Sequence, residues 1–73
     1  MDNINTLSWH ERIKFTRISL NLSQSEAAAL LEVSERTYRD WEAGKHFPSY
    51  PAQRALRRHF DITAQDLGLL PLG

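Results

Sequence analysis

Apolar residues recur with a helical period in several short segments of the chain, and most of these segments begin with a hydroxyl residue. Ser8, followed three residues later by Glu11, forms a capping-box pattern. The pattern predicts a first helix from about Trp9 to Leu20, in which Trp9, Ile13 and Leu20 fall near one stripe.

Two more helices are expected in quick succession. Ser23 opens a second helix over residues 24–31, a stretch rich in strong helix formers. After a break that begins at Glu32, Ser34 caps a third helix, which Gly44 ends. Two short helices joined by a tight turn make up a helix-turn-helix unit.

The rest of the chain predicts two further helices. Pro51 suits the first turn of a fourth helix that ends near Phe60. Thr63 and Asp66 carry a start signal for a fifth, short helix over residues 64–69. No segment alternates apolar and polar residues for long, so we expect no strands.

The expected fold class is therefore all-α, a compact five-helix domain that spans residues 1–73. Residues 1–7 are predicted to be loosely ordered, and residues 8–70 to form the helical core. Helical spacing places the following side chains in one core: Ile13, Ala28, Leu31, Val33, Tyr38, Trp41 and Leu56. Tyr38 and Trp41 also have the chemistry of base-stacking platforms, but their spacing favours the core.

Composition excludes several classes of protein. The 73 residues include no cysteine, which excludes disulfides and thiolate zinc sites. The three histidines, His10, His46 and His59, lie far apart without metal-ligand spacing, so we expect no metal, no cofactor and no catalytic site. No apolar run is long enough to span a membrane and no secretory signal is evident, so a cytoplasmic protein is expected.

The distribution of charge is more informative than its sum. The formal net charge is zero, which by itself argues against nucleic acid as a partner. Between residues 36 and 58, however, six basic residues face only two acidic ones. The basic residues are Arg36, Arg39, Lys45, Arg54, Arg57 and Arg58. A basic face of this kind suits contact with phosphates, and it is equally typical of a solvated helix surface.

The stretch from Leu22 to Lys45 reads LSQSEAAALLEVSERTYRDWEAGK. It resembles the helix-turn-helix of the Cro and phage-repressor family, also called the xenobiotic-response-element type. The residues that carry the resemblance are Leu22, Ser23, Gln24, Ala27, Ala28, Leu31, Val33, Ser34, Tyr38, Trp41, Glu42 and Gly44. With the flanking helices the resemblance covers nearly the whole chain. It implies a lambda-repressor-like DNA-binding domain in a prokaryotic or phage-encoded protein.

The resemblance also implies a structural ion pair between Arg17 and Glu42. The chain departs from the family pattern at Glu32, where relatives usually have glycine because the backbone there needs a positive φ. A side chain in that conformation costs about 1 kcal/mol, which a packed domain can absorb. A second departure is the fourth helix, where Arg57 and Arg58 replace residues that are often apolar or small.

By resemblance, the third helix reads base edges in the major groove. The expected base contacts are Glu35, Arg36, Arg39 and Asp40, and the expected phosphate contacts are Gln24, Ser34 and Lys45. Arginine binds guanine in a bidentate way and glutamate accepts from cytosine. The alternative is a solvated helix face held by the pairs Glu35–Arg39 and Arg36–Asp40. The arginines of the fourth helix suit phosphate or a protein partner equally.

The resulting hypothesis is a transcription regulator that binds double-stranded DNA, acting as a repressor and as a homodimer on a two-fold symmetric operator. One alternative is an antitoxin that binds both an operator and a toxin. Another is a protein-interaction module that has lost DNA binding. The apolar tail, residues 67–73, is expected to pair with a second subunit together with the adjoining face of the fourth helix, or else to cap the domain's own core.

Overall fold

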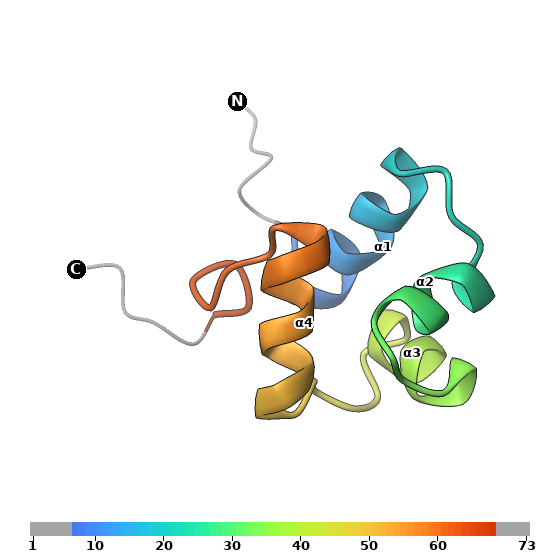
Figure 1. The fold of residues 1–73 in the computed structure, drawn as a ribbon. Coiled ribbons are helices and arrows are strands. Elements are labelled where there is room, and N and C mark those ends of the chain that lie inside the picture. The colour runs from blue at the N-terminus through green and yellow to red at the C-terminus, as the bar shows by residue number, and fades with distance from the viewer. Residues whose placement is uncertain (1–6, 69–73) are drawn as a thin grey trace.

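Four helices make up the fold, and none of the residues that the structure describes forms a strand. The structure is a computed structural model that describes residues 7–68. The helices are α1 (Trp9–Ser19), α2 (Gln24–Leu30), α3 (Glu35–Glu42) and α4 (Tyr50–Phe60). In Figure 1, α2 and α3 lie side by side at the right, α4 lies at the left, and α1 runs from behind α4 toward the upper right. The predicted all-α class is confirmed.

The helix starts are where the capping signals place them. Ser8 and Ser23 each accept a hydrogen bond from the backbone N–H three residues later, and the glutamate at that position reaches back to the cap's own N–H. Ser34 accepts from the Thr37 backbone N–H at 3.0 Å. Each cap satisfies a backbone donor that the first helical turn leaves unpaired. The predicted starts of the first three helices are confirmed.

The helix ends share one geometry. After α1, α2 and α3 the chain passes through a left-handed residue: Asn21 with φ 61°, Glu32 with φ 61° and Gly44 with φ 75°. After α2, the Glu32 N–H donates to the Ala29 carbonyl and the Val33 N–H to the Ala28 carbonyl. This is the Schellman pattern, which satisfies carbonyls at the end of a helix. The positive φ expected at Glu32 is confirmed.

A single cluster of buried side chains joins all four helices. Its members are Ile13, Ala27, Ala28, Leu31, Tyr38, Trp41, Ala52, Leu56, Phe60, Ile62 and Leu67, with Trp9, Leu22, Val33 and Ala55 partly buried against it. The predicted core is confirmed except that Val33 is only partly buried. Leu20 is 47% exposed, so its predicted place on the core stripe is wrong. It is the C-cap residue of α1 and extends beyond the last packed turn.

The predicted fifth helix is wrong. Thr63 and Asp66 do form reciprocal capping contacts, each at 3.1 Å. The segment completes only one turn, in which the Leu67 N–H donates to the Thr63 carbonyl, before Gly68 takes a left-handed φ of 78°. One turn fixes several residues for very few hydrogen bonds and does not propagate into a helix. Leu67 is 4% exposed and belongs to the domain's own core, so it is not available to an interface.

The predictions for the chain ends fall mostly outside the described residues. These are the loose order of residues 1–6 and the roles of residues 69–73. Within residues 7–68, no helix combines the length and apolar character needed to cross a membrane.

Candidate nucleic-acid interface

The third helix is anchored on one side and open on the other. Tyr38 and Trp41 are 0% and 2% exposed, and their rings meet at 61° with centroids 5.7 Å apart. Their burial leaves neither ring free to stack on a base. The side chains of Glu35, Arg36 and Arg39 emerge on the opposite, exposed side of α3. The helix therefore presents a polar outer surface on a rigid support.

The four expected base-contact residues differ in their surroundings. Arg39 Nη1 lies 3.0 Å from Glu35 Oε2, so these two side chains hold each other across one helical turn. Both stay about half exposed, a setting in which an ion pair adds little stability. Arg36 is exposed, and the structure gives it no ion pair with Asp40 or any other described residue. Asp40 is partly buried.

Beneath this surface, a hydrogen-bond network of Arg17, Gln24, Tyr38 and Glu42 connects three helices. We call it the Glu42 network. Arg17 in α1 donates from Nε to Glu42 Oε2 at 2.7 Å and from Nη2 to Oε1 at 3.2 Å. Gln24 at the start of α2 donates from Nε2 to Oε1 at 3.1 Å, and the Tyr38 hydroxyl donates to Oε2. One carboxylate thus fixes α1 and α2 relative to α3.

The electrostatics of the Glu42 network favour the ionised carboxylate. Burial opposes ionisation of Glu42, but the hydrogen bonds from Arg17, Tyr38 and Gln24 outweigh it and hold its pKa below the usual 4.5. The hydrogen bond to Glu42 raises the pKa of Arg17. Burial, together with donation to Glu42, raises the pKa of Tyr38. All three groups keep their usual charge states at neutral pH, so the network stays intact.

The expected phosphate contacts are brought together only in part. Gln24 and Lys45 line a hollow of about 460 Å³ between α1, α2 and α3, together with Arg39 and Asp40. The Gln24 amide nitrogen is already engaged with Glu42, and Ser34 lies at the other end of α3 with its hydroxyl bonded to Thr37. An approaching phosphate at Gln24 would therefore meet an amide held in place by Glu42.

One basic residue at this hollow was missed in the sequence. Lys14 is exposed on α1 and lines the same hollow as Lys45. The available signal was its position three residues before Arg17, which places both on neighbouring parts of one helix surface.

The loop after α3 is held against α1. The Trp9 and Phe47 rings meet edge to face with centroids 5.0 Å apart. A Cβ on Gly44 would lie 3.2 Å from the His10 ring, and the φ of 75° at Gly44 suits glycine. These contacts fix the path of the chain at Lys45.

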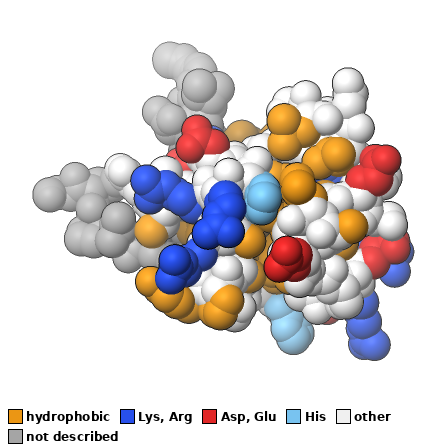
Figure 2. Space-filling model, viewed as in Figure 1, with side chains coloured by type: hydrophobic (Ala, Val, Ile, Leu, Met, Phe, Trp, Pro, Cys, Tyr) orange, Lys and Arg blue, Asp and Glu red, His pale blue; other side chains and the backbone are white. Residues whose placement is uncertain are grey.

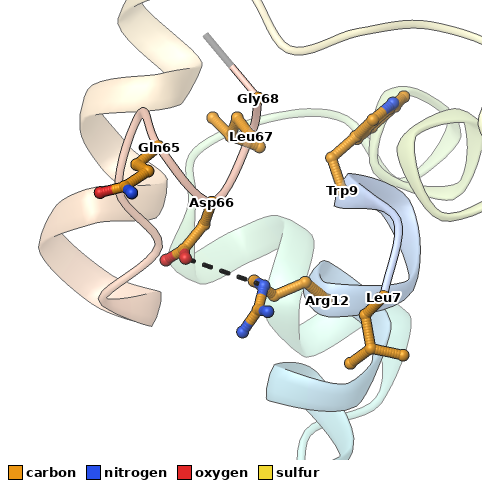
Figure 3. Close-up of a pocket in the computed structure, with 7 residues that line it drawn as sticks. All are labelled: Leu7, Trp9, Arg12, Gln65, Asp66, Leu67 and Gly68. Carbon is orange, nitrogen blue, oxygen red and sulfur yellow. Dashed lines mark ion pairs between the residues drawn. The ribbon is translucent and has the colours of Figure 1, made fainter. Parts of the chain in front are cut away.

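A second hollow, of about 510 Å³, lies between the start of α1 and the single turn over residues 63–68 that follows α4. Figure 3 shows Arg12 and Asp66 facing each other there, with Arg12 Nε 3.9 Å from Asp66 Oδ1. Among the described residues, the others that line this hollow are Leu7, Trp9, Gln65, Leu67 and Gly68. Over the described range, no three His, Cys, Asp or Glu side chains gather in a way that would hold a metal ion.

Comparisons with known proteins support a helix-turn-helix domain. A helix-turn-helix domain family matches residues 11–70. The chain is 28% identical over 61 residues to a protein of Enterococcus faecalis named HTH-type transcriptional activator BcrR. The match covers 84% of this chain and 30% of that protein, so the chain spans less than a third of this relative's length. No solved structure is significantly similar to the chain. The chain belongs to the helix-turn-helix domain family.

Proposed function

We propose that the protein is a sequence-specific regulator of the Cro and phage-repressor type that inserts α3 into the major groove of double-stranded DNA. The observation that carries the proposal is the pairing pattern on α3: Arg39 is held by Glu35, whereas Arg36 is exposed beside them without an ion pair among the described residues. An arginine with a free guanidinium suits bidentate binding to guanine. Glu35, Arg39 and Asp40 then contact bases or orient an arginine.

The phosphate contacts surround this helix. One hollow beside α3 is lined by Gln24, Lys45 and Lys14. Ser34 caps the first turn of α3. The open N-terminal end of a helix carries a partial positive charge that favours a phosphate. Because one buried cluster extends from Ile13 to Leu67, we further infer that the chain acts as a single domain.

The assembly and the sign of regulation extend the proposal. One helix makes too few base contacts for selective binding, so we propose that two copies bind a two-fold symmetric site. Repression by occupying a promoter is the simplest mechanism, and the name of the enterococcal relative supports activation as the second candidate. A promoter fused to a reporter separates them, because a repressor lowers expression and an activator raises it.

Competition titrations test the roles of the residues. On a duplex that the protein selects, Arg36→Ala should weaken binding by about 1–3 kcal/mol and relax the preference at one base pair. Lys45→Ala should weaken binding to all single-base variants of that duplex nearly equally. The assignment is wrong if Lys45→Ala changes the preference at one position while Arg36→Ala changes none.

A further inference from the structure

An exposed face of α4 carries three arginines that the proposed DNA interface does not use. Tyr50, Arg54 and Arg58 recur at every fourth position and so share one side of the helix, with Arg57 beside them. We call these four residues the arginine face. Tyr50 is 69% exposed. Figure 2 shows Lys and Arg side chains gathered over α4.

Two hollows flank the arginine face. One, of about 450 Å³, lies between the α2–α3 turn and α4, and the other, of about 390 Å³, lies on the side of Ala64. Tyr50, Arg54 and Arg58 line both of them. Neither hollow shares a lining residue with the one beside Gln24 and Lys45. The arginine face is therefore a surface distinct from the candidate nucleic-acid interface.

The larger of these two hollows is lined by a group of apolar residues together with charged and polar ones. Its apolar lining residues are Leu31, Val33, Tyr50, Pro51, Ala52 and Ala55. Arg54 and Arg58 border it, and Glu32 is the one acidic residue in its lining. None of the three arginines forms an ion pair with another described residue. Arg57 and Arg58 lie in the last turn, where they complement the helix dipole, but Arg54 lies in mid-helix and has no such role.

We propose that the arginine face binds an acidic segment of another protein, with an apolar side chain seated between α4 and the α2–α3 turn and carboxylates paired with Arg54 and Arg58. A DNA backbone would supply the negative charge but no apolar side chain for the hollow. A second copy of this chain, related by a two-fold axis through this face, would set arginines against arginines. A segment that alternates carboxylates and apolar side chains satisfies both features of the surface.

Selection of peptides from a random library displayed on phage, with the full chain as bait, tests the proposal. The enriched peptides should carry Asp or Glu on either side of Leu, Phe or another large apolar residue. Titrated into ¹⁵N-labelled protein, a synthetic copy should shift the amide signals of α4 and of Leu31 to Val33 and leave those of Lys14 and Lys45 unchanged. Enriched peptides without acidic residues, peptides that shift α3 instead, or no enrichment at all would each overturn it.

Charge variants show which side chains of the protein pair with the acidic residues of the peptide. Arg54→Gln with Arg58→Gln should weaken binding of the synthetic peptide about tenfold at low salt, since the double variant loses two exposed ion pairs, each of modest strength. Arg39→Gln, which removes an exposed arginine outside the hollow, should leave peptide binding unchanged. Glu32→Gln should tighten binding, because it removes the acidic residue that repels the peptide. Equal binding by the double variant and the parent would contradict the proposal.

Two further measurements separate the alternatives. The double variant Arg54→Glu with Arg58→Glu should no longer bind the acidic peptide. It should instead bind a peptide in which lysines replace the acidic residues, and a merely misfolded variant would not do so. The glutamine double variant should keep the parent's affinity for a random-sequence DNA duplex. If it loses as much DNA affinity as Lys45→Ala, the arginine face is a nucleic-acid surface and the proposal is wrong, whatever the outcome for α3.

Discussion

Glu32→Gly should stabilise the protein, although it removes an exposed side chain. Glu32 lies in the left-handed region with φ 61°, at the position that ends α2. A residue with a Cβ is strained there by about 1–2 kcal/mol, and glycine is not. Glycine also gives the unfolded chain more freedom, which offsets about 0.5–1 kcal/mol of that gain. The two ranges leave a net gain between zero and about 1.5 kcal/mol, and their midpoints leave a free energy of unfolding higher by about 0.75 kcal/mol.

Denaturant titration followed by circular dichroism measures this change, and the melting temperature should rise by about 2–8 °C for a domain of this size. Asn21→Gly is the matched control, because Asn21 has the same φ of 61° at the end of α1 but asparagine tolerates that region. Its gain should be smaller. Ala29→Gly, on the exposed face of α2, should instead lower stability by about 1 kcal/mol. A destabilising Glu32→Gly, or a gain no larger than that of Asn21→Gly, would refute the strain argument.

Three other substitutions test the core, the Glu42 network and the DNA surface. Trp41→Ala should cost about 3–5 kcal/mol, close to the whole stability of so small a domain, and a variant that melts within a few degrees of the parent would contradict the packing. Glu42→Gln should cost about 1.5–3 kcal/mol at neutral pH. Because folding lowers the pKa of Glu42, its ionised form stabilises the fold above pH 4.5, and this stabilisation is lost as the pH falls further. The free energies of unfolding of the parent and the variant should therefore converge as the pH is lowered. A difference that stays constant with pH would exclude a role for the Glu42 charge. Lys14→Ala should reduce the slope of log affinity against log salt for a DNA duplex by about 1, and an unchanged slope would remove Lys14 from the interface.

Features set by neighbours in the sequence were predictable. The serine caps act on backbone groups only three residues away, so Ser8, Ser23 and Ser34 mark the helix starts without knowledge of the fold. The same local logic failed for the fifth helix. Thr63 and Asp66 make the contacts of a helix start, but Gly68 ends the segment after one turn. A start signal alone therefore predicts one helical turn. A helix also needs a longer run of residues after the signal that can continue it.

Features set by contacts between helices were only partly predictable. The resemblance to the repressor family implied a contact between Arg17 and Glu42, but it did not predict the hydrogen bond from Gln24 to Glu42. Gln24 and Glu42 are 18 residues apart, and their contact depends on how α2 crosses α3. The exposure of Arg36 beside the paired Glu35 and Arg39 is likewise a matter of side-chain geometry, since the spacing allowed Arg36 to pair with Asp40 equally well.

Selection of binding sites from a pool of random duplexes tests whether α3 reads the sequence of double-stranded DNA. The predicted result is an enriched two-fold symmetric sequence, with half-sites about one helical turn of DNA apart and a guanine in each half-site at the position that Arg36 reaches. A pool that shows no enriched sequence after repeated rounds, while the protein remains folded, would contradict the claim.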